Sequence, residues 1–401
     1  MVSVELLHGA IRPYAWGSHS AIAALQGRPE PTQRPEAELW LGDHPRDPAM
    51  LEDGRSLADL ISADPVMTLG TDSLERYGQR LPFLLKVLAA QEPLSLQAHP
   101  DSEQAADGFA RQTREGVPLD APQRSYVDVH HKPELLCAVT RFEALCGFRP
   151  PSEAADAIER LKVDELSCLV AVLRQDDEAQ ALREAMTTLL TLPVDHRTRL
   201  VAAAVASATD LAEAGPDAAD YAMVVRLGTR YPHDSGALVA LLLNHLFLEP
   251  GDAIYMPAGN LHAYLGGVGI EVMAASDNVL RGGLTDKHVD VPELLRVLRF
   301  EVMAEPRFPA VEPTPGLRQW SVPVPEFALW RLRLDDEVTE QELHSEGAMI
   351  ILCWSGDLRI DDGERSLTLR PGQGAFIPAG VGKVFTTGTG ESYCAGVGAG
   401  R

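Results

Sequence analysis

Four side chains have the types and spacing of a metal site. Gln97 and His99 stand two residues apart, so on a strand both project from the same face. Glu134 heads an apolar run, where a buried carboxylate needs a partner. His262 follows a Pro-Ala-Gly corner. Two imidazoles, one carboxylate and one amide oxygen suit a borderline divalent ion such as zinc, with a position left for water or substrate.

Each of these residues also has a simpler interpretation. Gln97 and His99 could form the polar edge of a strand, and Glu134 could pair with Lys132. A lone histidine such as His262 is more often a structural residue than a ligand. The three segments taken together favour the metal site.

The corner before His262 occurs twice in the chain. The segment 248-LEPGDAIYMPAGNLHAYLGG-267 returns as 369-LRPGQGAFIPAGVGKVFTTG-388, with Lys383 in place of the histidine. The Pro-Gly turn, the short strand and the Pro-Ala-Gly corner match the second sequence motif of cupin barrels, and Gly259 can take a positive φ at that corner. The repeat predicts two barrel-like units, and only the first can offer an imidazole to a metal.

A second polar cluster lies between residues 271 and 291. It contains Glu271, Asp277, Arg281 and Lys287, and two glycines beside the arginine let a ligand or backbone approach closely. An arginine and a lysine near a barrel mouth can bind a phosphate. The alternative is a solvated loop with surface ion pairs, and the neighbouring metal site favours the binding role.

The elements that must position these residues alternate between β and α character. Short apolar runs broken by Gly, Pro and Asp predict strands before residue 150, apart from a helical excursion over 101–116. Alanine and leucine recur at helical spacing from 154 onward, including 237–248. We therefore predict a mainly β fold with an α insert, in which two cupin-like β-barrel or jelly-roll units accompany a helical domain: a catalytic cupin-like β domain over 1–150 and 249–304, the helical insert over 151–248, a Pro-rich linker over 305–316, and a C-terminal cupin-like β domain over 317–401.

Composition argues against several classes of protein. The chain has 401 residues and a formal net charge of −23, which disfavours a general binder of nucleic acid or anionic membranes, because phosphate backbones reward clustered Lys and Arg. Five cysteines without a C-x-x-C pair predict a reduced, intracellular chain. Neither a signal-peptide pattern nor an apolar run of membrane-spanning length is present. We expect a cytoplasmic monomer without nucleic-acid or membrane partners.

Several segments, in order along the whole chain, resemble the type I mannose-6-phosphate isomerase family. The combination of Gln-Ala-His-Pro, Lys-Pro-Glu, Pro-Ala-Gly-x-x-His and Ser-Asp-Asn-x-x-Arg is specific to that family. Small departures occur at Asp43 and Asp286, neither of which is a ligand position. The segments are 12-RPYAWG-17, 36-EAELWLGDHP-45, 82-PFLLKVLAA-90, 94-LSLQAHP-100, 131-HKPELLCA-138, 251-GDAIYMPAGNLHAYLGG-267 and 271-EVMAASDNVLRGGLTDKHVDV-291.

The resemblance implies one zinc ion per chain, held by Gln97, His99, Glu134 and His262, with Arg281 as the active-site arginine. It implies a small sugar-phosphate substrate and an aldose-ketose isomerisation that interconverts mannose 6-phosphate and fructose 6-phosphate through an enediol. That reaction needs a stabilised negative charge on the enediolate oxygen, a base near C1 or C2, and a group that holds the phosphate.

The identity of the base stays open at the level of sequence. Lys132 lies two residues from Glu134 and so on the same strand face, which makes it a candidate base or proton shuttle. Asp277 and Glu271 are carboxylate alternatives. Arg281 can place fixed positive charge near the developing oxyanion.

Four further residues are expected to contact the substrate. Lys86 and Ser95 lie on strands leading to the same mouth and fit phosphate or hydroxyl contacts, as do Glu271 and Lys287 in the polar cluster. Lys86 could instead be a surface residue whose stem covers apolar neighbours while its ammonium group reaches water.

Two other functions fit parts of the pattern. A metal-dependent cupin oxygenase generally uses His-x-His and open coordination for iron, whereas the first ligand here is Gln97, a poor donor for redox tuning. A non-catalytic sugar-binding cupin needs no base. Bound iron with oxygen consumption favours the first alternative, and a zinc-loaded protein without isomerase activity favours the second.

Overall fold

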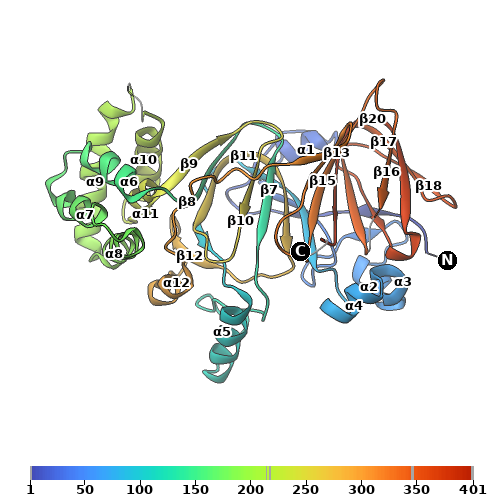
Figure 1. The fold of residues 1–401 in the computed structure, drawn as a ribbon, viewed down its shortest axis with the longest axis horizontal. Coiled ribbons are helices and arrows are strands. Elements are labelled where there is room, and N and C mark those ends of the chain that lie inside the picture. The colour runs from blue at the N-terminus through green and yellow to red at the C-terminus, as the bar shows by residue number, and fades with distance from the viewer. Residues whose placement is uncertain (1, 214, 216–217, 345–346, 399–401) are drawn as a thin grey trace.

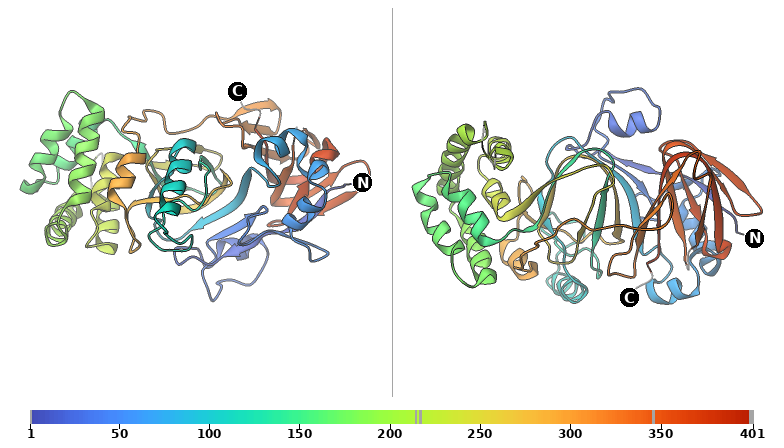
Figure 2. Two further views of the ribbon diagram at one scale, coloured as in Figure 1. Left: turned by 90° about the horizontal axis from the view of Figure 1, so that it is seen from below. Right: turned by 45° about the horizontal axis from the view of Figure 1, so that its top comes forward.

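The structure is a computed structural model that describes residues 2–213, 215, 218–344 and 347–398. Three parts follow one another along its longest axis (Figure 1): a group of helices, a central sheet, and a sheet built mostly from the C-terminal residues. Two further views show the same order, with the helices and the C-terminal sheet at opposite ends (Figure 2). The expected fold class, mainly β with a helical insert, is confirmed.

The central sheet has ten strands and contains the order β10-β7-β11-β5-β3-β2. The long strand β11 organises it, because β11 pairs antiparallel with β5, β6, β7 and β8. The strands are β2 (Ala10–Arg12), β3 (Glu38–Leu41), β5 (Phe83–Ala90), β6 (Leu96–Ala98), β7 (Glu134–Ala138), β8 (Phe142–Phe148), β9 (Leu243–Leu248), β10 (Ala253–Met256), β11 (His262–Ala274) and β12 (Leu280–Gly283).

The second sheet also has ten strands, in the order β13-β14-β15-β20-β17-β19-β1-β4, with β16 on β20 and β18 on β17. Its strands are β1 (Glu5–His8), β4 (Met50–Leu51), β13 (Val311–Thr314), β14 (Leu317–Trp320), β15 (Ala328–Leu334), β16 (Glu340–His344), β17 (Met349–Asp361), β18 (Ser366–Leu369), β19 (Gly374–Ile377) and β20 (Lys383–Gly396). The predicted linker over 305–316 thus contains the exposed strand β13, which pairs with β14.

The assignment of residues 1–150 to one β unit predicted that all N-terminal strands lie in the central sheet. Two of them, β1 and β4, lie in the second sheet instead. β1 pairs with β19, where Glu5 lies opposite Phe376, and β4 pairs with β1. Leu7 and Leu51 pack into a core that lies between the two sheets. The alternation of apolar and polar residues in a short strand predicts which face is buried, but it does not predict the strand with which it pairs. Packing therefore decides which sheet such a strand joins.

The two copies of the repeated corner are flanked by matching strands, but the corners themselves differ: Gly259 has a positive φ, whereas its counterpart Gly380 lies in the 3-10 turn η3 (Ala379–Val381) and has no positive φ. β10 before the first corner and β19 before the second occupy matching positions. After the corners, β11 begins at His262 and β20 at the matching Lys383. Gly259 has φ of 78°, as predicted, and a Cβ there would lie 2.7 Å from the side chain of Arg299. A substituent at this glycine would therefore be strained as well as crowded.

The helical insert forms largely as the leucine and alanine spacing predicts, and its last segment does not. Residues 237–248, expected to be helical, form only a short helical stretch before β9, which pairs with β8. A short apolar run has no period that separates a buried strand from a helix. The helices from α1 (Ala21–Leu25) to α4 (Thr71–Tyr77) were not expected either, whereas α5 (Ser102–Arg114) confirms the helical excursion over 101–116.

None of the helices in the described ranges has both the length and the apolar character needed to cross a bilayer. The helices are α1 (Ala21–Leu25), α2 (Leu57–Ala63), α3 (Pro65–Leu69), α4 (Thr71–Tyr77), α5 (Ser102–Arg114), α6 (Pro151–Glu159), α7 (Ser167–Leu173), α8 (Glu178–Thr191), α9 (Val194–Leu211), α10 (Ala218–Arg230), α11 (Gly236–Val239) and α12 (Val291–Val297), with short 3-10 turns η1 (Asp164–Leu166), η2 (Ala240–Leu242) and η3 (Ala379–Val381).

A charge network fastens the helical insert to the central sheet. His245 on β9 is buried, with Nε2 2.9 Å from Glu143 of β8 and Nδ1 2.8 Å from Asp220 of α10. Arg149 and Arg226 complete it, each pairing with one of the two carboxylates. Burial alone would lower the pKa of His245, but its hydrogen bonds to the two carboxylates raise it. The two carboxylates therefore favour the charged form of the imidazole in the folded state.

We expect His245→Leu to lower the free energy of unfolding by about 2 kcal/mol, because hydrogen bonds to charged groups contribute roughly 1.5–3 kcal/mol each. The pKa of His245 is raised above its ordinary 6.5, so this stabilisation is fully present below pH 6.5 and is lost as the pH rises through the folded-state pKa. Urea unfolding of wild type and variant on both sides of that range measures the difference.

The exposed His344 provides the matched control, since its side chain is 67% exposed and pairs only at the surface with Glu342. His344→Leu should leave stability nearly unchanged at every pH. A loss from His245→Leu that stays the same at acid and alkaline pH would show that the imidazole is uncharged in the folded protein.

Candidate metal centre and active-site cavity

Three predicted ligands, His99, Glu134 and His262, meet where three strands of the central sheet begin or end. His99 follows β6 directly, Glu134 opens β7, and His262 opens β11. β11 places His262 opposite Gln97 of β6, two residues before His99. Glu134 lies opposite Met256 of β10 and opposite Met273, near the other end of β11. The ligand atoms of the two histidines and the glutamate all lie within 4.8 Å of one another, and no other such group occurs in the described part of the chain.

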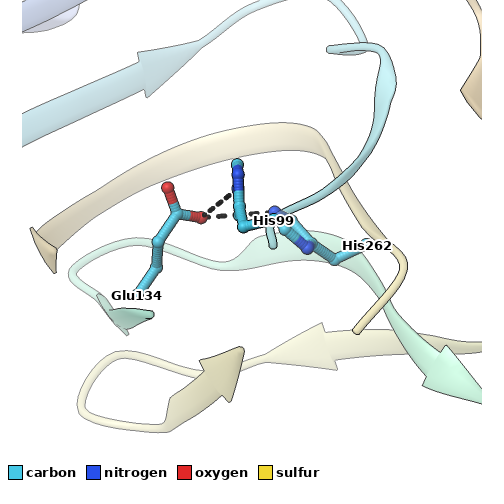
Figure 3. A group of neighbouring side chains, drawn as sticks. All are labelled: His99, Glu134 and His262. Carbon is cyan, nitrogen blue, oxygen red and sulfur yellow. Dashed lines mark ion pairs between the residues drawn. The ribbon is translucent and has the colours of Figure 1, made fainter. Parts of the chain in front are cut away.

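Both imidazoles turn the same nitrogen toward one carboxylate oxygen (Figure 3). Nε2 of His262 lies 3.2 Å and Nε2 of His99 3.4 Å from Oε2 of Glu134. The opposite nitrogens face backbone carbonyls: Nδ1 of His99 is 2.7 Å from the Asn278 carbonyl oxygen, and Nδ1 of His262 is 3.3 Å from that of Asn260. A nitrogen facing a carbonyl carries the proton, so each Nε2 presents its lone pair.

The cluster fits a bound divalent cation. Nε2 of His99 is buried and has no hydrogen-bond partner. Burial lowers the pKa of His99 to about 4, so the ring is neutral at pH 7. Burial alone would raise the pKa of Glu134, but the Lys132 ammonium and the imidazoles hold it well below its usual range. Two imidazole nitrogens and a carboxylate oxygen thus converge in a buried place, and a metal ion satisfies all three.

The fourth predicted ligand, Gln97, lies beside this cluster. It is half-buried on β6, opposite both His262 of β11 and Arg281 of β12, and it faces the same cavity as Glu134. Its backbone position fits the sequence-derived ligand set, and its bond to a metal stays a prediction.

A cavity of about 560 Å³ opens beside the cluster and collects the other predicted site residues. Those on its wall are Lys86, Ser95, Gln97, Lys132, Glu134, His262, Glu271, Asp277, Arg281 and Lys287. His99 stands behind them against Glu134. Residues drawn from six separate stretches of sequence therefore share one space next to the metal cluster, large enough for a small ligand.

Lys86 is part of a buried charge network and does not reach toward water, so the surface interpretation is wrong. Its Nζ lies 2.6 Å from Glu271 and 3.2 Å from Glu38. Burial alone would lower the pKa of Lys86, but these two carboxylates raise it, and the ammonium stays charged. Tyr264 donates to Glu271 at 2.6 Å and Trp40 donates to Glu38 at 2.7 Å. The network forms a fixed, hydrogen-bonded wall of the cavity.

Two of the three candidate groups for proton transfer, Lys132 and Asp277, have different surroundings. Nζ of Lys132 lies 2.9 Å from Oε1 of Glu134, the oxygen that does not face the imidazoles. Asp277 pairs with His44 at 3.1 Å and Arg46 at 2.5 Å. Burial alone would raise the pKa of Asp277, but these two contacts hold it well below its usual range. A carboxylate stabilised in this way is a weak base.

Arg281 and Lys287 bring positive charge to the cavity. Among the described residues neither has a carboxylate within ion-pair distance. Burial lowers the pKa of Arg281, and burial together with the charge of Arg281 lowers that of Lys287. Two cations without counter-charges beside a cavity in an acidic chain suit an anionic ligand.

Sequence reasoning missed part of the cavity wall. Arg12, Tyr14 and Trp16 reach it from the N-terminal segment, and Arg230 and Tyr231 reach it from the end of α10. Only the resemblance contained a signal for the first three, since they fall in one of its segments or border it. The last two come from the helical insert, for which no site role was predicted.

Residues 5–151 match the family described as phosphomannose isomerase type I, catalytic domain. Over 393 residues the chain is 36% identical to mannose-6-phosphate isomerase of Escherichia coli, covering 97% of this chain and 98% of the relative. The chain belongs to the type I phosphomannose isomerase family. This confirms the resemblance drawn from the sequence and the expectation that the chain is an enzyme, an isomerase.

Other relatives and solved structures agree. Mannose-6-phosphate isomerase of Homo sapiens is 33% identical over 425 residues, covering 96% of this chain and 93% of the relative. A crystal structure of zinc-bound mannose 6-phosphate isomerase has a TM-score of 0.90 at 34% identity, covering 99% and 100% of the two chains. The Salmonella typhimurium enzyme bound to fructose 6-phosphate and zinc has a TM-score of 0.89 at 34% identity, with the same coverage.

Proposed function

We propose that the protein interconverts mannose 6-phosphate and fructose 6-phosphate with one zinc ion per chain. The convergence of His99, His262 and Glu134 beside the cavity carries the proposal. Relatives support the substrate, since the Escherichia coli protein is a mannose-6-phosphate isomerase and the Salmonella typhimurium protein has been crystallised with fructose 6-phosphate and zinc. Family membership gives no support to the oxygenase or to the non-catalytic sugar binder.

Gln97, His99, Glu134 and His262 would hold the zinc. When bound, zinc supplies a Lewis acid that polarises a substrate oxygen. The Asn278 and Asn260 carbonyls orient the two imidazoles for this task, as partners of metal-bound histidines do.

The remaining chemistry falls to charged side chains on the cavity wall. Isomerisation moves a proton between C1 and C2 through an enediol, and negative charge develops on an oxygen. The Arg281 guanidinium has no carboxylate partner among the described residues, so its charge is free to stabilise that oxygen. Nζ of Lys132, 2.9 Å from Glu134, is the group we assign to proton transfer. Asp277 is a weaker choice, because His44 and Arg46 hold its pKa well below the usual range. Glu271 is a weaker choice, because Tyr264 engages its Oε1 and Lys86 its Oε2.

The substrate contacts follow from the same wall. Lys287 holds the phosphate, since it too lacks a carboxylate partner among the residues that the structure describes. Ser95 and the Lys86–Glu271 pair face the cavity and contact sugar hydroxyls. Buried groups held by hydrogen bonds give such contacts a fixed direction.

A coupled assay that follows conversion of mannose 6-phosphate to fructose 6-phosphate tests the function. Chelation of the metal should lower kcat on the order of 10³-fold, since Lewis-acid stabilisation of the transition state is worth several kcal/mol. Adding back zinc should restore the rate. Activity that survives complete metal removal would contradict the metal's role.

A further inference from the structure

A residue of the C-terminal sheet unit touches the segment that leads into β7. Glu326 lies between β14 and β15, and its Oε1 is 2.8 Å from Nε2 of His131, a residue 195 positions away in sequence. The two side chains are 15% and 21% exposed. His131 directly precedes Lys132, so the contact lies one residue from the group assigned to proton transfer.

The segment places alternate side chains in two different cavities. Lys132 and Glu134 line the active-site cavity, whereas His131 and Pro133 line another, of about 480 Å³. Alternation of this kind is the geometry of an extended chain. A contact that fixes His131 on one side therefore restricts the direction in which Lys132 points on the other.

The loop that carries Glu326 cannot shift easily relative to β7. Val322 and Phe327, on either side of Glu326, are buried in the core that also contains Leu135 and Cys137 of β7. In a close-packed core, the backbone segments that contribute side chains can move very little relative to one another. The carboxylate is thus held at a fixed place against the lead segment.

The opposite side of the segment is held as well. Nδ2 of Asn278 donates to the carbonyl oxygen of His130 at 2.8 Å, and Pro133 accepts from the amide of Ala274. These contacts fix the backbone, whereas the one with Glu326 fixes a side chain. Among the residues that the structure describes, Glu326 is the one hydrogen-bond and ion-pair partner of the His131 side chain.

Glu326 sits in a place that is not optimal for stability. Its Oε2 is buried and has no hydrogen-bond partner. Unsatisfied buried oxygens are rare in folded proteins and call for an explanation beyond stability. The side-chain hydrogen bond of this carboxylate to His131 offers that explanation.

We propose that Glu326 is a positioning residue: through His131 it orients Lys132 and the start of β7 in the active-site cavity. The C-terminal unit, whose described residues take no part in the metal cluster, then contributes to turnover from outside the cavity. The inference rests on the proposed function, because it concerns the group assigned to proton transfer in that reaction.

The test compares Glu326→Ala, Glu326→Gln, His131→Ala and the double variant Glu326→Ala/His131→Ala in the zinc-loaded full chain. We expect Glu326→Ala to lower kcat about 10-fold, since small misplacements of a catalytic group cost up to about 100-fold. KM for mannose 6-phosphate, bound zinc and Tm should stay near the wild-type values. Glu326→Gln keeps an acceptor oxygen for His131 and should recover most of the rate.

The double variant decides whether Glu326 acts through His131. If it does, the double variant is no slower than His131→Ala alone. Glu342→Ala is the control, because Glu342 is an exposed carboxylate of the same unit that pairs with His344 and Lys383. It should match the wild type.

Other results would overturn the inference. Wild-type kcat in Glu326→Ala, or additive losses in the double variant, would remove Glu326 from the reaction while leaving the isomerase function intact. A loss of kcat that comes with lost zinc and a lowered Tm would make its role structural. A zinc-loaded wild type that does not convert mannose 6-phosphate would reject the proposed function itself, and the inference with it.

Discussion

His262→Ala is expected to lose bound zinc and to lower kcat on the order of 10³-fold, whereas Lys383→Ala leaves both unchanged. The two residues open equivalent strands after the two copies of the repeated corner. His262 is buried with Nε2 3.2 Å from Glu134, whereas Lys383 is exposed and lies 3.4 Å from Glu342 at the surface. The comparison therefore separates the corner's backbone from the chemistry it presents.

Two measurements check this prediction without relying on activity. Zinc per chain is determined by elemental analysis after dialysis against a weak chelator. Zinc should also raise the Tm of the wild type and of Lys383→Ala, because a ligand that binds only the folded state stabilises it, and should have little effect on His262→Ala. One zinc per chain retained in His262→Ala would reject the ligand assignment.

The meeting of His99, Glu134 and His262 was predictable because each of these residues carries a local signal, whereas the role of Gln97 as a fourth ligand stays a prediction. Gln97 and His99 share a strand face by spacing, and Glu134 is a carboxylate at the head of an apolar strand. His262 stands at a fixed place after a corner whose turn residues have their own conformational demands. The strand pairs that join them, β6 and β7 with β11, then follow from burial of the apolar strands.

The partners of the other charged residues were not predictable in this way. Asp277 looked like an available carboxylate, but it pairs with His44 and Arg46, more than 200 positions earlier in the chain. Lys86 was expected to contact the substrate, with a surface position as the alternative, and its pairing with Glu38 and Glu271 depends on β5 lying between β3 and β11. Side-chain type predicts that a buried charge needs a partner, and only the sheet order says which partner it finds.

The strand and helix errors have a related cause. The segment after residue 242 has the leucine content of a helix, yet it forms β9 because β8 offers an unpaired edge there. β1 and β4 join the C-terminal sheet because Leu7 and Leu51 complete a core between the two sheets. Local pattern indicates that such segments are buried, and the choice of neighbour is a property of the whole chain.

Arg281→Ala is expected to lower kcat about 10²–10³-fold with a small change in KM, the effect of removing one donor that stabilises a developing oxyanion. The guanidinium is half-buried on β12 opposite Gln97, and no carboxylate among the described residues neutralises it. Its charge therefore acts at full strength on the substrate. Arg281→Lys should recover only part of the loss, because an ammonium group lacks the planar fork that fixes direction.

Whether the substitution changes kcat or KM shows which anionic group of the substrate Arg281 contacts, the enediolate oxygen or the phosphate. A large rise in KM with kcat unchanged would mean that Arg281 holds the phosphate equally in ground and transition states, and Lys132 and the metal would then have to stabilise the enediolate without it. Arg174→Ala is the control, since Arg174 pairs at the surface of the helical insert with Asp156 and Glu159. Steady-state kinetics of the three variants at equal zinc content measure the effect, and the zinc content shows that a lower kcat comes from the missing charge and not from a damaged metal site.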